Sequence, residues 1–467
     1  MSFASPLYLP FLGLAAWLVF AARRWGRAPL VLLSGASLLF YATWNPLYCL
    51  ALLGTVTVDW AVGRRLGRTA SPRARRWLLA ASLAYNLGAL ATFKYFNLMV
   101  ETASGAAAAL GGELIVPLRI AFAVGISFYT FQSLSYVIDV YRGDQTPCRS
   151  WLAYLAFVSF FPTLLSGPIT RAETLLPQLE REPRRLDDRQ LGQALFLLAS
   201  GFVKKGAADF LGLNLVNRVF DLPGMFSAGE VLAAIYGFAV QIYLDFAGYS
   251  DIAFGSALVL GVRLRDNFNS PYRAADLVEF WRRWHISFST WLRDYLFFAL
   301  PGKDPKTAWP YLNLVITFAL GGLWHGAAWT YLAWGVLHGV GLALQHLAGR
   351  RAGASAPWRR TGGAVLTFHF VAFSWLFFRC QSLGEIGTLL AQLGRGSWHL
   401  GNVPPAAAAV VVATYALQWL PETTWSRVQE AFVALPAVAQ AGCLAAVFVG
   451  LRLLAGAAPA PFIYFAY

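Results

Sequence analysis

The sequence predicts an all-α polytopic membrane protein with roughly ten to twelve membrane segments, some of them re-entrant or broken helices. Of its 467 residues, 58% are hydrophobic and only 13% are charged, whereas a soluble protein carries about a quarter charged residues. The apolar residues fall in long runs, and the arginines gather in short clusters between them. These clusters follow the positive-inside pattern of cytoplasmic loops, so the net charge of +14 does not indicate a nucleic-acid partner.

The first apolar runs set the orientation of the chain. Residues 6–22 are followed at once by three arginines at 23–27, whereas a secretory signal places its positive charges before the apolar core. We therefore expect a membrane anchor with the N-terminus on the periplasmic side. Residues 28–44 and 46–62 then form a hairpin of two spans, which returns the chain to a second arginine cluster at 64–76.

Further apolar runs complete the membrane frame. The run at 119–141 holds Asp139, and an ionisable residue in such a run should face protein or water rather than lipid. The run at 228–262 carries Asp245 and Asp251 and is too polar for a helix that faces lipid. The later spans are expected at residues 77–93, 119–141, 191–221, 228–262, 362–378, 405–420 and 433–455.

The apolar run at 151–169 does not fit a simple crossing. Basic residues flank it on both sides, which would place both of its ends in the cytoplasm. Pro162, Gly167 and Pro168 interrupt it, and irregular backbone is tolerated at membrane depth only where protein covers it or where it lines a cavity. We therefore interpret this run as a re-entrant or broken helix beside an internal cavity.

Residues 279–339 hold three of the six histidines. Two of them, His325 and His338, occupy the same place in a Gly-x-x-His-Gly frame, at 322–326 and 335–339. Glycines beside His325 would let another backbone or a substrate approach it. Burial disfavours the charged form of an imidazole, so we expect His325 to act as a neutral base toward a hydroxyl group.

The spacing of these two histidines limits how they cooperate. On one continuous helix, the 13 residues from position 325 to position 338 would separate the side chains by about 20 Å and about 220° of rotation. They could not share a ligand in that arrangement. If they do cooperate, the chain must turn after Gly326 so that two separate elements meet.

Motifs of several other chemistries are missing from the sequence. The four cysteines have neither Cys-x-x-Cys nor zinc-finger spacing, and no carboxylate stands at helical spacing from a histidine, so no metal site is predicted. Residues 125–129 and 248–252 lack the last glycine of a Gly-x-Ser-x-Gly elbow. These absences favour direct transfer, in which a base activates one substrate to attack another.

A basic, tryptophan-rich piece precedes the two Gly-x-x-His-Gly frames and contains Arg282, Arg283, Trp284 and Arg293. Two interpretations remain open. The piece could be an interfacial helix anchored at the lipid headgroups, in which case His285 belongs to the membrane surface and is not a catalyst. Alternatively, these four residues form a wall that binds an anionic acyl donor, such as the tail of coenzyme A.

Several short segments, collinear over nearly the whole chain, carry a specific resemblance. They are Phe93-Lys94-Tyr95-Phe96-Asn97, Gly125-Ile126-Ser127-Phe128-Tyr129, Phe161-Pro162, Ser166-Gly167-Pro168, Gly201-Phe202-Val203-Lys204-Lys205, Asn267-Phe268-Asn269 and the pieces at 135–142, 245–251, 281–295 and 321–326. In these segments the sequence resembles the membrane-bound O-acyltransferase family. It is most similar to the bacterial branch with alginate O-acetyltransferase and the D-alanyl-lipoteichoic acid transferase.

The resemblance implies acyl transfer from a cytoplasmic thioester, acetyl-CoA or another acyl thioester, with no permanently bound cofactor. The acyl group would pass through a central tunnel to a hydroxyl group on the other side of the membrane. The invariant histidine of the family matches His325, and a second important histidine matches His338. By this resemblance, His325 would deprotonate the acceptor hydroxyl group, which then attacks the thioester carbonyl.

Closeness to the alginate branch favours an acetyl group destined for an exported polysaccharide, delivered directly or through a periplasmic acyl-accepting partner protein. Peptidoglycan or teichoic acid as acceptor, and D-alanine as the acyl group, remain alternatives. A transporter with a relay of His and Asp side chains is the alternative of another class, although no paired halves with matching broken helices are present. We expect a single domain in the bacterial cytoplasmic (inner) membrane over residues 1–467, with N-terminal spans at 1–118, a catalytic core at 119–345 and C-terminal spans at 346–467.

Overall fold

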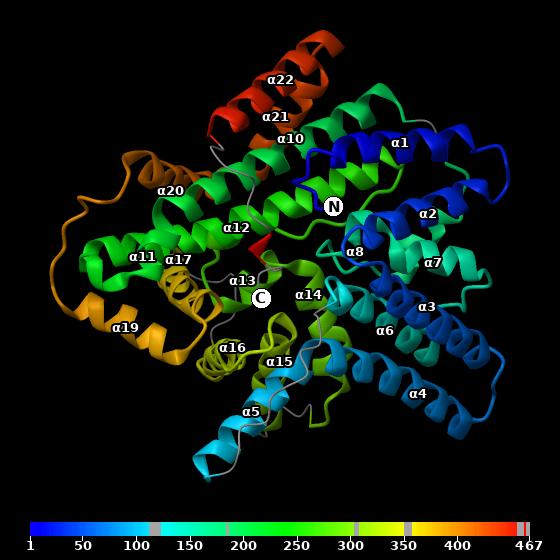
Figure 1. The fold of residues 1–467 in the computed structure, drawn as a ribbon, viewed down its shortest axis with the longest axis horizontal. Coiled ribbons are helices and arrows are strands. Elements are labelled where there is room, and N and C mark those ends of the chain that lie inside the picture. Colours follow the sequence, from blue (N-terminus) through cyan, green and yellow to red (C-terminus); the bar gives the residue numbers. More distant parts are fainter. Residues whose placement is uncertain (112–122, 184–185, 303–307, 350–356, 455–461, 464–467) are drawn as a thin grey trace. The chain divides into compact units, whose positions relative to one another are not determined.

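The computed structural model describes residues 1–111, 123–183, 186–302, 308–349, 357–454 and 462–463, and no strand occurs among them. The fold is therefore all-α, as expected. The chain forms two compact units, of which the first is Met1–Asp187 with Ser256–Leu264 and the second is Asp188–Gly255 with Arg265–Tyr467. Figure 1 labels the helices of both. The boundary at Asp187 falls inside the 119–345 segment.

The first unit is built from helices that follow one another through short connections. They are α1 (Tyr8–Ala21), α2 (Ala28–Ala42), α3 (Pro46–Leu66), α4 (Pro72–Leu90), the π-helix η1 (Ala91–Tyr95), α5 (Phe96–Ala109), α6 (Ile126–Arg142), α7 (Trp151–Ser159), α8 (Phe161–Leu164) and α9 (Ala172–Leu179).

The last residues of α12, from Ser256 on, belong to the first unit. The second unit contains the remaining helices. They are α10 (Asp188–Leu211), η2 (Gly212–Val216), α11 (Asn217–Asp221), η3 (Pro223–Met225), α12 (Ala228–Val259), η4 (Pro271–Arg273), α13 (Leu277–Arg283), α14 (Ile286–Trp291), η5 (Leu292–Leu296), η6 (Phe297–Ala299), α15 (Trp309–His325), α16 (Trp329–Leu347), α17 (Pro357–Ser374), α18 (Leu376–Arg379), α19 (Leu383–Gly394), α20 (Pro405–Leu417), α21 (Glu422–Val433) and α22 (Ala437–Leu454).

Local capping signals explain where several of these helices begin. Asn45 caps α3, since its side chain accepts a hydrogen bond of 2.9 Å from the amide of Leu47. Ser71 caps α4 in the same way. Each helix has proline as its first residue, where the missing N–H costs nothing and the fixed φ favours a helical start. The turn expected between 28–44 and 46–62 is therefore formed by the cap itself.

The apolar run at 151–169 is broken, as predicted. It forms α7 of nine residues and α8 of four, and nine residues of helix rise only about 13 Å, against a hydrocarbon core of about 30 Å. The chain then returns toward its starting point, because Cys148 Sγ lies 3.9 Å from Glu180 Oε1.

Three described helices are long and apolar enough to cross a membrane: Pro46–Leu66, Ala228–Val259 and Trp358–Arg379. The pair Glu422–Val433 and Ala437–Leu451, bent by 118°, would add a fourth. The expected membrane segments include re-entrant and broken helices, and further apolar runs form shorter helices, among them α1, α2 and α20.

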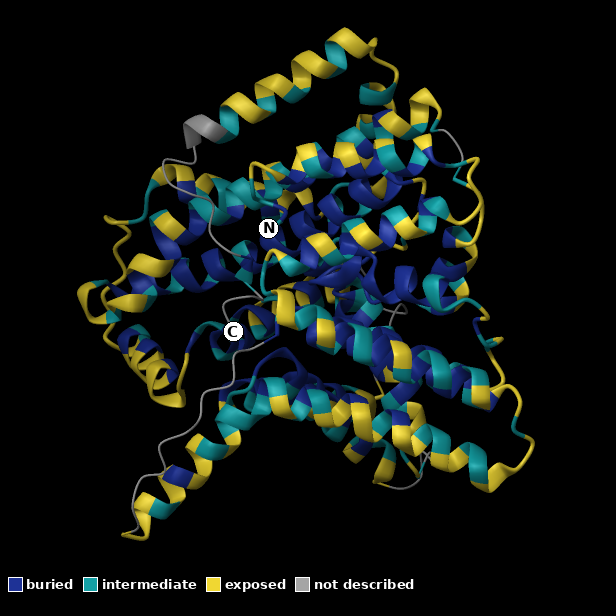
Figure 2. Cartoon of the chain, turned by 45° about the vertical axis from the view of Figure 1, so that its right-hand side comes forward, coloured by how far each residue is buried: buried dark blue, intermediate teal, exposed yellow. Residues whose placement is uncertain are grey.

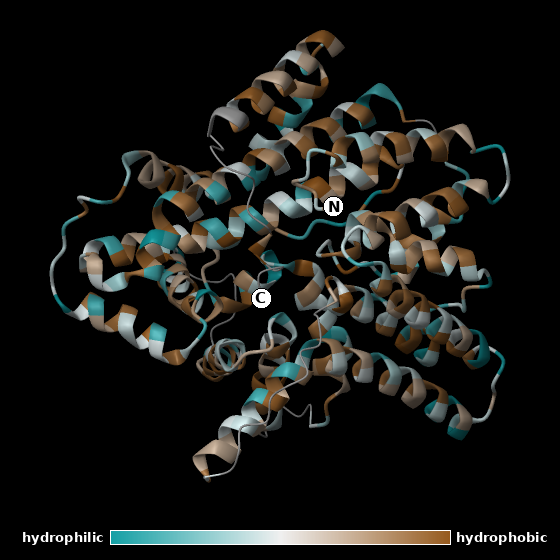
Figure 3. Ribbon diagram, in the orientation of Figure 1, coloured by the Kyte–Doolittle hydropathy of each residue, from teal (hydrophilic) through white to brown (hydrophobic). Residues whose placement is uncertain are grey.

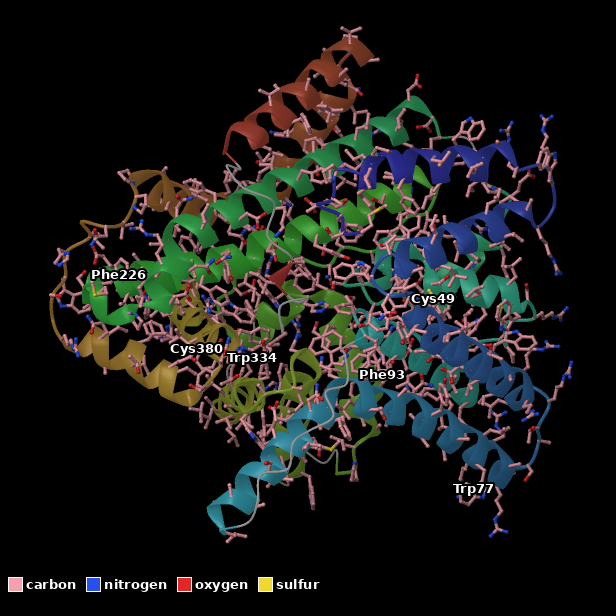
Figure 4. All side chains as sticks on the ribbon, in the orientation of Figure 1. Cys49, Trp77, Phe93, Phe226, Trp334 and Cys380 are labelled. Carbon is pink, nitrogen blue, oxygen red and sulfur yellow. The ribbon has the colours of Figure 1, made fainter. Side chains whose placement is uncertain are left out.

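The outer surface is apolar in many places. Exposed residues dominate on α22 (Figure 2), although this helix is largely hydrophobic (Figure 3). Its Val438 is 85% exposed, and elsewhere Trp77 is exposed as well (Figure 4). Large apolar surfaces of this kind mark contact with membrane or partner, and here they agree with a chain that is surrounded by lipid.

The core of the first unit is organised around a buried carboxylate, that of Asp59 on α3. It accepts hydrogen bonds from Ser82 Oγ at 2.6 Å, Asn86 Nδ2 at 2.8 Å and Ser133 Oγ at 2.6 Å. Ser133 in turn bonds Tyr154 at 2.7 Å. One carboxylate therefore ties α3 to α4 and α6, and through Ser133 to α7.

Candidate active site

The chain turns sharply after His325. Helix α15 ends at this residue, Gly326 has extended backbone, and α16 begins at Trp329. The two helices then pack against each other. The turn that cooperation between His325 and His338 requires is therefore present at the expected place.

The glycines of both frames let these two helices approach closely. A Cβ on Gly322 would lie 2.1 Å from the carbonyl oxygen of Tyr331, and a Cβ on Gly335 would lie 2.1 Å from that of Phe318. Both neighbours are backbone atoms, which cannot move aside without shifting a helix. The repeated Gly-x-x-His-Gly frame is thus a helix-packing device that presents a histidine at each of its two positions.

His325 lies in a buried aromatic surrounding. Its ring centroid is 4.8 Å from that of Phe288, 5.1 Å from that of Phe378 and 5.3 Å from that of Trp334. Trp334, labelled in Figure 4, also contacts the ring of His338 at 4.7 Å. One indole therefore connects the two histidines of the repeated frames.

His338 is fully buried and hydrogen-bonded from one side. Its Nε2 lies 2.9 Å from Ser374 Oγ, and that hydroxyl group donates its own hydrogen to the carbonyl of Val371 at 2.7 Å. Ser374 can therefore only accept, and Nε2 of His338 is the donor. Its Nδ1 has no hydrogen-bond partner among the residues that the structure describes.

His285, expected with the tryptophans and arginines of an interfacial helix, has its side chain in the protein interior. Its side chain is fully buried, and its ring centroid is 4.6 Å from that of Phe246, 5.1 Å from that of Phe288 and 6.3 Å from that of His325. Burial lowers the pKa of His285 to about 3. The structure thus adds a second neutral imidazole to the surroundings of His325.

The backbone at His285 is strained. Its φ of 42° and ψ of 55° lie in the left-handed region, which is unfavourable for any residue with a Cβ. Of the described non-glycine residues, only Ser270 shares a positive φ. This conformation joins α13 to α14, and residues held in such regions cluster at functional sites.

The basic, tryptophan-rich piece does not assemble into one wall. Arg282 and Arg293 are exposed, and Arg293 pairs with Asp294 at 2.7 Å. Arg283 is held by Glu279 at 2.8 Å and donates to the carbonyl of Asn269 at 3.0 Å. Trp284 is buried among aromatic side chains. The short helix α13 and its flanks therefore turn their indoles inward, and the residues proposed for donor binding face different surroundings.

Asp245 and Asp251 of α12 face another helix, as expected for a helix too polar for lipid. Lys204 on α10 pairs with Asp251 at 2.5 Å, and Lys205 pairs with Asp245 at 2.8 Å and Asp209 at 2.7 Å. These three carboxylates are thus paired with two lysines, which weakens the alternative of a proton-relaying transporter. No group of three or more His, Cys, Asp or Glu side chains that could hold a metal ion occurs in the described ranges.

Comparison with known proteins gives the family. Residues 142–384 match the model of the membrane-bound O-acyltransferase family. The chain is 37% identical to a probable alginate O-acetylase of Pseudomonas aeruginosa, with 84% of this chain and 75% of that protein covered. The corresponding values for a probable alginate O-acetylase of Azotobacter vinelandii are 38%, 83% and 79%.

A further relative has a different acceptor in its name. A peptidoglycan O-acetyltransferase of Helicobacter pylori is 32% identical, over 74% of this chain and 70% of that protein. The family match covers more than half of the chain, and these identities extend over most of its length. The chain therefore belongs to the membrane-bound O-acyltransferase family and is a multi-pass membrane acyltransferase.

Proposed function

We propose that this protein O-acetylates an exported or cell-surface polysaccharide and takes the acetyl group from a cytoplasmic thioester such as acetyl-CoA. The observation that carries the proposal is the buried histidine site, in which the rings of His325 and His285 lie 6.3 Å apart. The similarity to probable alginate O-acetylases over 84% of the chain supports the choice of acyl group and acceptor.

In the proposed reaction His325 is the general base. It takes the proton of the acceptor hydroxyl group, whose oxygen forms a bond to the thioester carbonyl carbon. The carbon–sulfur bond then breaks, and the departing thiolate receives the proton, which yields an ester and a free thiol. A positioned base of this kind contributes about 10²–10⁴-fold to the rate. His285 offers a second proton acceptor beside the first.

His338 has a different part in this proposal. Its ring contacts Trp334, and Trp334 contacts His325. We therefore assign His338 as a positioning residue that holds the indole against the catalytic imidazole. For the anionic donor, the exposed guanidinium groups of Arg282 and Arg293 are the remaining candidates, because Arg283 and Trp284 are engaged within the fold.

The decisive experiment replaces His325 with alanine and measures acetyl groups on the exported polymer. We expect acetylation to fall by about 10²-fold or more, with the variant present in the membrane at the normal level. His369→Ala is the matched control, because His369 is an exposed histidine of the same unit. Normal acetylation by the His325 variant would refute the assignment.

The chemical identity of the released acyl group and of the labelled polymer separates acetyl from D-alanyl, and polysaccharide from peptidoglycan or teichoic acid.

We also propose an orientation in the bacterial inner membrane, with the N-terminus in the periplasm and the arginine cluster at 64–76 in the cytoplasm. Arg75 supports it, since it donates to the carbonyls of Leu66 and Tyr141, at the ends of α3 and α6, at 2.5 and 2.6 Å. Both helix ends therefore lie on one side. Reporter tags at Ser150 and Glu173 should both be cytoplasmic, and opposite locations would contradict the re-entrant arrangement of α7.

A further inference from the structure

We infer that Asn267 is a positioning residue of the histidine site, because its side chain fixes the tautomer of His285 and its main chain holds the turn that presents the ring. The inference rests on the proposed function, since it concerns the second imidazole beside His325. Asn267 is fully buried in the connection between α12 and η4. Its side chain therefore does not contact solvent, and its role depends on the residues to which it hydrogen-bonds.

The two ends of the Asn267 amide can be told apart from its partners. Its Oδ1 accepts a hydrogen bond from the backbone N–H of Ser287 at 3.1 Å and from the hydroxyl group of Ser287 at 2.9 Å. A backbone N–H can only donate, so the atom that faces it must be the carbonyl oxygen. The opposite end, Nδ2, lies 3.4 Å from Ser250 Oγ on α12.

The same Oδ1 atom lies 3.3 Å from Nδ1 of His285. Because an amide oxygen can only accept, the hydrogen of the neutral ring must be on Nδ1. Nε2 then carries the lone pair and is the basic nitrogen. Nε2 is buried and has no hydrogen-bond partner among the described residues. Asn267 therefore leaves His285 with one basic nitrogen that is available to a substrate or a proton.

The main chain of Asn267 supports the same turn. Its carbonyl oxygen accepts from the amide of Ile286 at 3.0 Å, directly after the left-handed residue His285. Asn267 thus holds the residues on the C-terminal side of His285 through its backbone and the ring itself through its side chain.

The other contacts of the His285 ring show that its tautomer depends on Asn267 Oδ1. The other rings in contact with it are those of Phe246, Phe288, Trp324 and His325, of which only the imidazole of His325 is titratable. The phenyl rings carry no hydrogen-bonding group, and His285 Nε2 has no hydrogen-bond partner among the described residues, so neither Trp324 nor His325 holds it. In the neutral state, Asn267 is therefore the contact that decides which nitrogen of His285 is basic.

The first test is a double-mutant cycle on turnover in proteoliposomes, with acetyl-CoA as donor. Asn267→Ala should lower kcat by about 10²-fold, the loss expected when a catalytic group is misplaced, and leave the KM for acetyl-CoA unchanged. The double variant Asn267→Ala, His285→Ala should be no slower than His285→Ala alone, because Asn267 acts through that ring. Additive losses would overturn the inference. Asn214→Ala is the matched control, since the side chain of Asn214 donates to the carbonyl of Phe210 in its own helical region and to no other described residue.

The second test uses Asn267→Asp, which keeps the shape of the side chain and is measured as kcat against pH. A carboxylate beside the ring favours the imidazolium and so raises the pKa of His285. Because Nε2 accepts a proton only when the ring is neutral, the acidic limb of the profile should move to higher pH. An acidic limb that stays in place would contradict the assignment, even if Asn267→Ala proved too unstable to measure.

The outcomes separate this inference from the proposed function. If His325→Ala remains active, the proposed function fails, and the inference falls with it. If His325→Ala is inactive while His285→Ala turns over normally, the proposed function stands and the role of Asn267 is refuted. Loss of activity in both, with no further loss in the double variant at Asn267, supports both.

Discussion

The rings of Trp334 and His338 are in direct contact, with centroids 4.7 Å apart, and the same indole contacts His325 at 5.3 Å. If His338 acts by holding this indole, replacing His338 should lower turnover less than replacing the base His325. We expect His338→Ala to lower turnover about tenfold, and His325→Ala to lower it by about 10²–10⁴-fold. Turnover of the purified variants with acetyl-CoA measures both. An equal loss in two folded variants would make His338 a catalytic residue instead.

The close approach of α15 and α16 predicts a strong effect of small substitutions. Gly335→Ala places a methyl group 2.1 Å from the carbonyl oxygen of Phe318, so the helices must separate. Overpacking of this kind costs about 1–3 kcal/mol, and thermal unfolding in detergent should show it as a lower transition temperature. Gly362→Ala is the control, because nothing lies within 4 Å of the added Cβ. Equal transition temperatures for the two variants would contradict the packing argument.

The carboxylate of Asp59 should be essential for the stability of the first unit. Asp59→Ala leaves the side chains of Ser82, Asn86 and Ser133 without their shared acceptor, and each hydrogen bond to a charged group contributes about 1.5–3 kcal/mol. We expect this variant to fail to accumulate in the membrane. Asp59→Asn retains one acceptor oxygen and should accumulate at a reduced level. Normal yield and unfolding temperature of Asp59→Ala would show that other contacts hold these helices.

We expect the folded protein to lose stability on acidification, because Glu279 becomes protonated. Burial alone would raise its pKa, but hydrogen bonds from the amide of Ala275 and from Arg283, with the charges of Arg283 and Arg360, outweigh burial and lower it. A carboxylate with a lowered pKa in the folded state stabilises the protein above its unfolded pKa of about 4.3. This contribution is lost as the pH falls through the folded value. Unfolding temperatures between pH 7 and 3 measure it, and Glu279→Gln should flatten part of the dependence.

Much of the fold follows from local sequence features. Apolar runs and arginine clusters locate the helices, and Pro162, Gly167 and Pro168 correctly predict a broken run. Hydropathy does not tell a full-length span from a shorter apolar helix such as α1, α2 or α20. The helix α5 lies between the spans expected at 77–93 and 119–141, where no element was expected.

The site could be predicted only in part. The repeated glycine frame locates His325 and His338, and their spacing predicts a turn after Gly326 if the two cooperate, which the structure contains. The arginine neighbours of His285 suggest that its side chain is exposed. In the structure Arg282 is exposed, but the side chains of Trp284 and His285 are buried. The signal that could have identified it is the polar segment at 267–269, yet no local rule pairs Asn267 with a histidine on a later element.

The left-handed backbone of His285 lowers the stability of the fold at a position where we propose a role in transfer. A glycine would adopt this conformation without steric cost, so natural variation selected for stability alone would drift toward glycine there. With a histidine at this position, the fold tolerates about 1–2 kcal/mol of local strain, and the imidazole stands beside His325. Thermostabilised versions of this enzyme should therefore be screened for transfer activity before a change at position 285 is accepted.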